Sequence, residues 1–487
     1  MALALSPASA AFVTIYGGAN YAPGVGGFSG GSGAVNDAGA AVGTAFKVDA
    51  SDPNYVYRAV RWDASGMDAT ELGNLGTDTR GQTQSGARAI NNAGAAVGHV
   101  DKYDGSGVNN GYRAVRWDAS GTAAVELGHL GTNVSGFTSS SAGAINSAGT
   151  VVGVADKWDA SGASKGGRAV RWDASGTAAT ELGNLGTTPR GYTLSYASAI
   201  NDTGTVVGAV HKWDASGVDK GNRAVRWDAS STTAVELGNL GTDASGYTYH
   251  YVLAINSAGT AVGSADKYDA SGVTVGSRAV RWEGTGTAAI ELEHLGTTTG
   301  GFTQSQAWAI NTAGAAIGEA WKFYDSGDDL YPAPVRWDAS GAATELGNLG
   351  RDASGRAFGL VSAINDAGIA VGNADDYDDS GTLLGERAVD WGFDAVAVDL
   401  NSLIDPTSEW TLNRAQTISD TGWISGSGIF DPDGPGGQEA YGRAFIMYVP
   451  ATAVPEPATV VLFGVALVGI GIGVASRRRV RRNVMTE

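Results

Sequence analysis

Short apolar stretches alternate with polar, glycine-rich stretches along nearly the whole chain. In one representative segment the apolar stretches predict four β-strands, at about 87–91, 95–100, 112–117 and 123–127. The sequence NNAG joins the first strand to the second, and DASG joins the third to the fourth. Both are typical of tight turns in which glycine adopts a positive φ. Because these segments lack the 3.6-residue period of a helix, the pattern predicts short antiparallel strands.

This four-strand pattern recurs at a nearly fixed interval. The residue after the first strand recurs at intervals of 55 and finally 54 residues, at Asn36, Asn91, Asn146, Asn201, Asn256, Asn311, Asn365 and, in a degenerate copy, Ser419. The aromatic residue that ends the third strand recurs at Trp62, Trp117, Trp172, Trp227, Trp282, Trp337, Trp391 and Tyr448. An acidic residue of the fourth strand recurs in register with both. A period of about 50 residues is typical of propellers and solenoids.

Four antiparallel strands per repeat predict an all-β fold, with each repeat of about 55 residues forming one blade of a β-propeller. The copies predict eight blades. The eighth copy ends at Tyr448 without a fourth strand, whereas Phe12–Tyr16 is a strand candidate that has no repeat of its own. We therefore expect Phe12–Tyr16 to pair with Arg443–Tyr448 and close the ring. The first strands contain small residues such as Ala89 and Ala144, and we expect them to lie next to the central channel.

Composition narrows the range of functions. The chain carries 32 Lys and Arg residues against 50 Asp and Glu, a net charge of −18. It therefore lacks the basic surface that a nucleic-acid backbone requires, and nucleic acid is not an expected partner. The absence of cysteine excludes disulfides and thiolate chemistry. No pair of its five histidines has metal-ligand spacing, and the irregular repeats from the sixth to the eighth contain no catalytic set. We therefore expect a protein that is not an enzyme.

Most repeats carry an arginine in the third strand and a glutamate in the fourth, nine or ten residues apart. On adjacent antiparallel strands the two would face each other, and we expect structural ion pairs. These are Arg61–Glu71, Arg116–Glu126, Arg171–Glu181, Arg226–Glu236, Arg281–Glu291 and Arg336–Glu345. In the seventh repeat the same positions hold Asp390 and Asp399. We expect a displaced side chain or a bound cation there, and a locally weaker blade.

Two further features are candidates for ligand binding. The loop between the second and third strands is acidic, most densely at Asp375, Asp376, Asp378 and Asp379. Oxygen ligands in turns suit Ca²⁺, although Asp-Ser-Gly is also ordinary turn chemistry, so calcium is an alternative to the absence of any cofactor. Aromatic residues after the second strand would stack on sugars if exposed, or pack between blades if buried. They are Tyr103, Trp158, Trp213, Tyr268 and Tyr377.

The repeats resemble the HAF family of extracellular repeats over about residues 34–448. The family's pattern appears here as RAVRW, then ELGNLGT, then ASAINDTGTVVG at Ala197–Gly208. Arg61 and its equivalents depart from the pattern, because the family has an apolar residue at this position. The resemblance implies an exported repeat protein and specifies no ligand.

The C-terminal segment combines three consecutive features. The motif Val454-Pro455-Glu456-Pro457 precedes 18 uncharged residues at 458–475. Five arginines follow, at Arg477, Arg478, Arg479, Arg481 and Arg482. A helix of this length rises about 27 Å, close to the thickness of the hydrocarbon core of a bilayer. Adjacent arginines would hold the tail in the cytoplasm. The segment resembles a PEP-CTERM sorting signal.

This resemblance implies processing by an exosortase-type transpeptidase in a Gram-negative bacterium that makes exopolysaccharide. The C-terminal helix would anchor the protein in the inner membrane, and cleavage near Pro455–Pro457 would pass it to the cell surface or the extracellular matrix. Exopolysaccharide or a cell-surface protein would be its partner there. A permanent single-span anchor is the alternative to cleavage.

These features predict a domain order and a function. We expect the end of a signal peptide at 1–10, the propeller at 11–449, a linker at 450–457, a transmembrane helix at 458–475 and a basic cytoplasmic tail at 476–487. The expected function is that of a non-enzymatic binding or structural module. A propeller enzyme that acts on extracellular glycan, and a calcium-binding adhesin, are the alternatives.

Overall fold

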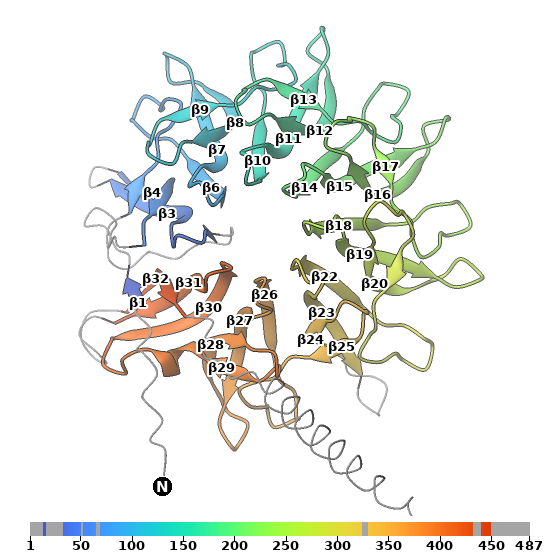
Figure 1. Cartoon of the computed structure of the whole chain (residues 1–487). Coiled ribbons are helices and arrows are strands. Elements are labelled where there is room, and N and C mark those ends of the chain that lie inside the picture. Colours follow the sequence, from blue (N-terminus) through green and yellow to red (C-terminus); the bar gives the residue numbers. More distant parts are fainter. Residues whose placement is uncertain are drawn as a thin grey trace, which may run out of the picture. The chain divides into compact units, whose positions relative to one another are not determined.

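The computed structural model describes residues 13–15, 33–49, 52–64, 69–323, 330–431 and 440–449. These residues form eight four-stranded antiparallel sheets, arranged as blades around a central axis (Figure 1). In the first seven blades the strands follow one another in chain order across the sheet. The eight-bladed propeller predicted from the repeat count is therefore confirmed.

The strands of the first four blades have the following bounds. Blade 1 contains β2 (Ala34–Val35), β3 (Ala41–Asp49), β4 (Asp52–Trp62) and β5 (Thr70–Glu71). Blade 2 contains β6 (Ser85–Ile90), β7 (Ala96–Tyr103), β8 (Asn109–Trp117) and β9 (Ala124–Glu126). Blade 3 contains β10 (Ser140–Ile145), β11 (Val151–Trp158), β12 (Ser164–Trp172) and β13 (Ala179–Glu181). Blade 4 contains β14 (Ser195–Ile200), β15 (Val206–Trp213), β16 (Asp219–Trp227) and β17 (Val235–Glu236).

The remaining blades have the same order, except for the last. Blade 5 contains β18 (His250–Ile255), β19 (Ala261–Tyr268), β20 (Thr274–Trp282) and β21 (Ile290–Glu291). Blade 6 contains β22 (Ser305–Ile310), β23 (Ala316–Phe323), β24 (Leu330–Trp337) and β25 (Ala343–Glu345). Blade 7 contains β26 (Gly359–Ile364), β27 (Ala370–Tyr377), β28 (Leu383–Trp391) and β29 (Ala397–Asp399). Blade 8 contains β30 (Trp410–Ile418), β31 (Trp423–Phe430), β32 (Tyr441–Tyr448) and β1 (Val13–Ile15).

Two glycines per repeat explain the geometry of the inner hairpin. In blade 3 the N–H of Gly149 donates to the carbonyl oxygen of Asn146 at 3.0 Å. Gly149 has a φ of +87°, which glycine adopts without strain. Gly153 lies opposite a register shift in β10, where a Cβ would be 2.0 Å from the carbonyl oxygen of Ser141. The repeated turn and the repeated -VG- sequence thus fix how β10 and β11 pair.

The apolar cores lie between neighbouring blades. Between blades 2 and 3, Trp172 of blade 3 is buried against Val97, Ala114 and Leu127 of blade 2. The indole N–H of Trp172 also donates to the carbonyl oxygen of Gly128, at the end of the fourth strand of blade 2, at 2.9 Å. Because each tryptophan needs the preceding blade to bury it, the stability of one blade depends on its neighbours.

The ends of the propeller chain close the ring. β1 pairs antiparallel with β32, with Val13 opposite Met447 and Ile15 opposite Phe445. The predicted pairing of an N-terminal strand with the last incomplete blade is therefore confirmed. Blade 8 also contacts blade 1, where the hydroxyl of Thr421 donates to the carbonyl oxygen of Asp37 at 2.8 Å.

In the part of the chain that the structure describes, no helix is long and apolar enough to cross a membrane. The helical element there is the 3₁₀ turn η1 (Leu400–Leu403). The segments predicted at 1–10, 450–457, 458–475 and 476–487 lie outside the described residues, as do Phe12 and Tyr16.

Candidate functional site

The ring has two faces that differ in their connections. The tight turns between first and second strands, and between third and fourth strands, lie on one face, which we name the turn face. The loops between second and third strands, and the connections from one blade to the next, lie on the other, which we name the loop face. This follows from the antiparallel order of the four strands.

On the turn face, a ring of asparagines surrounds the axis. The Oδ1 atom of Asn146 accepts from the N–H of Thr150 at 2.9 Å and caps the turn of its own blade. Its Nδ2 atom donates to the carbonyl oxygen of Asn201, in the next blade, at 3.1 Å. The same interblade bond, at 3.0–3.2 Å, is made by Asn36, Asn91, Asn146, Asn201, Asn256, Asn311 and Asn365. Each asparagine therefore links two blades.

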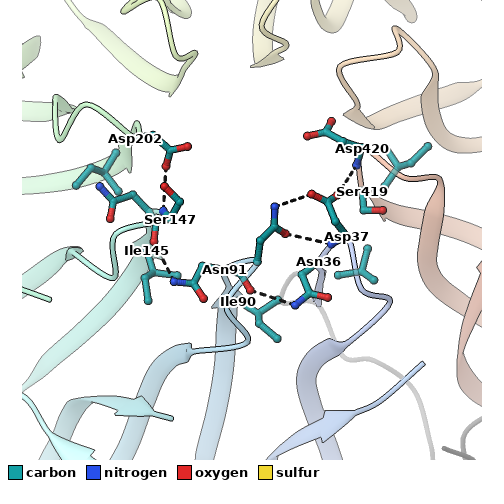
Figure 2. A pocket seen from close by; sticks show the side chains of 14 residues that line it. Asn36, Asp37, Ile90, Asn91, Ile145, Ser147, Asp202, Ser419 and Asp420 are labelled. Carbon is teal, nitrogen blue, oxygen red and sulfur yellow. Dashed lines mark hydrogen bonds between the residues drawn. The ribbon is translucent and has the colours of Figure 1, made fainter. Parts of the chain in front are cut away.

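At five of the eight boundaries between blades, the residue after the axial asparagine or after Ser419 adds a second link (Figure 2). The N–H of Asp420 donates to Oδ1 of Asp37 at 2.9 Å, and the N–H of Asp366 donates to Oδ1 of Asp420 at 2.8 Å. The N–H of Ser147 donates to Oδ1 of Asp202 at 2.9 Å. Burial raises the pKa of Asp420, and the charges of Asp366 and Asp37 raise it further. Three successive blades, 7, 8 and 1, thus contribute carboxylates to the rim of the channel.

These two rings of residues line an axial hollow of about 280 Å³. Its wall comes from blades 1–4 and 8 and includes Ile90, Ile145, Asp37, Asp202 and Asp420. The carboxylates that face it accept backbone hydrogen bonds from neighbouring blades. Its lining residues, all within the described part of the chain, include no histidine, lysine, arginine or tyrosine. The arrangement joins neighbouring blades together.

The structure corrects the predicted ion pairs. In blade 3, Oε1 of Glu181 lies 3.2 Å from Nε of Arg168, and Oε2 lies 2.6 Å from Nζ of Lys157. Arg171, the predicted partner, instead donates to the carbonyl oxygen of Ala229 in the next blade at 2.7 Å. The equivalent glutamates have equivalent partners, in the pairs Arg58–Glu71, Arg113–Glu126, Arg223–Glu236, Arg278–Glu291 and Lys322–Glu345.

The strand register explains why the predicted arginine–glutamate pairs do not form. Glu181 lies opposite Val170, and Arg171 lies opposite Thr180, so the glutamate and Arg171 point to opposite faces of the sheet. Arg168, two residues before Val170, shares the face of the glutamate. The predicted partners Arg61, Arg116, Arg226 and Arg336 likewise reach backbone carbonyls of the following blade, and Arg281 pairs with Glu283.

The carboxylates of the seventh blade are displaced from each other for the same reason. Asp390 lies opposite Val398, and Asp399 lies opposite Val389, so their side chains leave the sheet on opposite faces. Asp399 caps η1, where its Oδ1 accepts from the N–H of Asn401 at 2.8 Å. Burial, and then the charge of Asp394, raise the pKa of Asp390 to about 6. The register is the same as in the other blades, so the like-charge contact from which a displaced side chain or a cation was expected does not occur.

The acidic loop of blade 7 is a set of turn caps. Oδ1 of Asp378 accepts from the N–H of Ser380 at 2.8 Å and from its hydroxyl at 2.6 Å, and hydrogen bonds from Ser380 lower the pKa of Asp378. Asp375 accepts from the hydroxyl of Tyr377, Asp376 lies 3.6 Å from Arg387, and Asp379 is exposed. Among the described residues, no three histidine, aspartate or glutamate side chains come together as metal ligands. Calcium binding by this loop stays a prediction.

The aromatic residues after the second strands pack between blades. The indole N–H of Trp158 donates to Oγ1 of Thr138 at 3.2 Å, and that of Trp213 donates to Oγ1 of Thr193 at 3.1 Å. The lysine before Trp158 belongs to the ion pair with Glu181. Tyr103, Tyr268 and Tyr377 donate their backbone N–H groups to the preceding blade connection. The indole hydrogen bonds favour the packing interpretation over sugar stacking for Trp158 and Trp213.

A different group of aromatic residues lies on the loop face, and the sequence analysis missed it. Tyr192, Tyr196, Tyr249 and Tyr251 belong to the entry and first strands of blades 4 and 5. Tyr196 and Tyr249 are each 40% exposed, and the rings of Tyr249 and Tyr251 meet edge to face with centroids 5.8 Å apart. The signal in the sequence is that Tyr196, Tyr249 and Tyr251 differ from the residues of most other repeats, whereas Tyr192 occupies a position that also holds Phe137, Tyr247 and Phe302.

Comparison with known proteins assigns the C-terminal segment. Residues 453–479 match the PEP-CTERM protein-sorting motif. The PEP-CTERM motif is a substrate signal for exosortase-type processing, and it includes the predicted Val454–Pro457 and Arg477–Arg479. These residues lie outside the described part of the chain. No sequence among the curated proteins matches this chain. The resemblance of the repeats to the HAF family stays a prediction.

Several solved propellers have a similar fold. The β-propeller domain of the Trilobed protease from Pyrococcus furiosus is 10% identical, with 79% of this chain and 97% of that chain covered and a TM-score of 0.39. The Dos1 propeller is 9% identical, with 90% and 95% covered and a TM-score of 0.40. The GH74 xyloglucanase from Xanthomonas campestris is 12% identical, with 90% and 69% covered and a TM-score of 0.38. At such low identity, these similarities say nothing about the activity of this chain.

Proposed function

We propose that this chain is an exported β-propeller that an exosortase-type system sorts to the cell surface or the extracellular matrix, where it serves as a non-enzymatic binding or structural module. The observation that carries the proposal is the PEP-CTERM motif at 453–479, which follows a propeller whose last described residue is Val449. Because the ring closes before the motif begins, cleavage there would release the propeller intact.

The uses of the recurring polar groups support a module without catalysis. The axial asparagines link successive blades, and the recurring glutamates neutralise buried arginines such as Arg168. The body is strongly acidic, which keeps an exported protein soluble and disfavours binding to polyanions. We therefore assign binding to residues that depart from the repeat.

The test is the terminal mass of the native protein isolated from its own cells, together with its location. We expect the protein in the cell-surface or extracellular fraction, with a C-terminus close to Pro457. A matched variant in which Pro455, Glu456 and Pro457 are all replaced by alanine should keep Glu487 and remain in the inner membrane. A wild-type protein recovered from the cytoplasm would refute export, and a surface protein that retains Glu487 would establish a permanent anchor instead.

The absence of catalysis has its own test. The purified protein, incubated with extracellular polysaccharides and with peptides, should release neither reducing sugar nor new peptide termini. Release that persists in wild-type protein but disappears on heat unfolding would overturn the non-enzymatic assignment.

A further inference from the structure

The repeats provide an internal comparison for each position of a blade. A residue that the fold requires recurs, as the tryptophans and axial asparagines do. Four residues before the isoleucine that ends the first strand, blades 2–7 carry Gly86, Ser141, Tyr196, Tyr251, Gln306 and Leu360. Six residues before it they carry Gln84, Ser139, Leu194, Tyr249, Gln304 and Phe358. The fold therefore accepts small and polar residues where blades 4 and 5 present tyrosine.

The strand pairing brings these tyrosines together. Tyr196 on β14 lies opposite Ala209, and Tyr251 on β18 lies opposite Ser264. β14 and β18 are the neighbouring inner strands of blades 4 and 5 (Figure 1). Tyr196 and Tyr251 occupy equivalent positions on these two strands, and the ring of Tyr251 meets that of Tyr249 edge to face. The three rings thus form one surface.

The tyrosine surface, defined here as Tyr192, Leu194, Tyr196, Tyr249 and Tyr251, combines exposed ring area with buried polar support. Tyr192 and Leu194 are 37% and 39% exposed. Ser264 lies directly opposite Tyr251 in the sheet, so the two side chains share one face. Burial raises the pKa of Tyr196, and a hydrogen bond with Asn222 lowers it to a smaller extent. Asn222 and Ser264 are fully buried, and within the described residues Nδ2 of Asn222 and Oγ of Ser264 lack a well-aligned hydrogen-bond partner.

Charge narrows the chemistry of the ligand. Tyr247, which borders the tyrosine surface, lies near the carboxylates of Asp219 and Asp266, and both raise its pKa in addition to the dominant effect of burial. Lys165 and Lys220, on the third strands of blades 3 and 4, already pair with Asp159 and Asp214. A ligand rich in carboxylate or sulfate would be repelled by the carboxylates of Asp219 and Asp266, so a neutral ligand suits this surface better.

We infer that the tyrosine surface binds a neutral polysaccharide chain. Exposed tyrosine rings stack on the C–H faces of sugar rings, and their hydroxyls exchange hydrogen bonds with sugar hydroxyls. Rings contributed by two adjacent blades suit an extended ligand that covers both. This inference names a ligand class for the binding module proposed above, but it does not depend on whether the C-terminus is cleaved.

The test is affinity electrophoresis of the full chain in gels that contain hydroxyethyl cellulose, dextran or alginate. We expect at least one of the neutral polymers to retard the protein and alginate not to. The triple variant Tyr196→Ala, Tyr249→Ala, Tyr251→Ala should weaken retardation at least about tenfold. The corresponding triple Tyr→Phe variant keeps the rings and should lose less. The matched control is Phe393→Ala, which removes a 66% exposed aromatic from a turn on the opposite face.

The possible outcomes separate this inference from the proposed function. Retardation by alginate only, by no neutral polymer, or equally in wild type and the triple alanine variant would overturn the inference. A photo-reactive residue placed at Tyr249 that captures a cell-surface protein, in the absence of glycan retardation, would overturn it in favour of a protein partner. Export would be unaffected by any of these results, because the terminal mass and the cellular location report it independently.

Discussion

Replacement of one axial asparagine measures how strongly neighbouring blades are linked. Asn146→Ala removes the hydrogen bond from Nδ2 to the carbonyl oxygen of Asn201 at 3.1 Å and the one from the Thr150 N–H to Oδ1 at 2.9 Å. The side chain is buried, so each bond contributes about 0.5–1.5 kcal/mol net. Loss of the cap also leaves the N–H of Thr150 partly buried without a partner. We expect a total loss of about 2–3 kcal/mol in the free energy of unfolding.

A serine variant separates the two bonds. In blade 8, Ser419 occupies the position of the asparagine, and its Oγ accepts from the N–H of Trp423 at 3.0 Å, which preserves the turn cap. The short side chain does not span to the next blade, where Thr421 and Asp420 make the contacts to Asp37 instead. Asn146→Ser should therefore keep the cap, lose the interblade bond and cost about 1 kcal/mol.

The assay is guanidinium unfolding of the full chain, followed by far-ultraviolet circular dichroism, with the slopes required to agree among variants. Ser147→Ala is the matched control: its backbone N–H makes the bond to Asp202, so loss of the exposed side chain should change stability by less than about 0.5 kcal/mol. If the serine variant is as stable as the control, or if neither variant differs from the control, the asparagine ring does not link the blades energetically.

Three further predictions concern charged groups. Glu181→Gln should lower the free energy of unfolding by about 2–4 kcal/mol, because it leaves the buried Arg168 without a counter-ion. A double-mutant cycle should show coupling of Glu181 to Arg168 and not to Arg171, whose guanidinium bonds to a backbone carbonyl. Coupling to Arg171 would support the ion pair predicted from the sequence instead. Asp390 has a pKa raised from 3.8 to about 6, so the native state binds more protons than the unfolded chain and stability falls as pH rises through this window. Asp390→Asn should remove that loss and slow amide exchange in blade 7, which we expect to be the fastest of the blades; equal protection in all blades would contradict this. His250 is buried with a pKa lowered from 6.5 to about 4, so stability falls as pH drops through that range, and His250→Ser, which restores the residue of other repeats, should flatten the profile measured by thermal unfolding.

The fold was predictable because its determinants recur. The tryptophan that ends the third strand is buried between blades, and its indole N–H bonds to the preceding blade, so the same residue is required in each copy. The glycine of the tight turn recurs because its positive φ does. The closing strand was predictable because the last repeat lacks a fourth strand and the N-terminal residues contain a strand that belongs to no repeat. Strand ends were less predictable: β7 continues to Tyr103 through Asp101 and Lys102, which resemble loop residues, because Lys102 pairs with Glu126.

The partners of charged residues were not predictable from spacing. Arg171 and Glu181 are adjacent in the sheet, but a difference of one residue in register places them on opposite faces. Nothing in a ten-residue interval distinguishes Arg171 from Arg168 as the partner. The partner depends on the register of the third and fourth strands, which the length of the turn between them sets. The pairing of Val170 with Glu181 shows this register.

Residues that bind a ligand are harder to predict than the fold, because residues that recur in every repeat are the ones that the fold requires. Asparagine, tryptophan and glutamate recur and are used in links between blades, so their repetition carries no information about a ligand. Tyr196 and Tyr251 occupy one position of the repeat, and this position holds glycine, serine, glutamine or leucine in blades 2, 3, 6 and 7 without change of fold. Whether the two side chains lie near each other depends on which faces of β14 and β18 they occupy, and the strand register determines these faces. In an array of near-identical blades, the departures from the repeat are therefore the positions at which a ligand can be recognised.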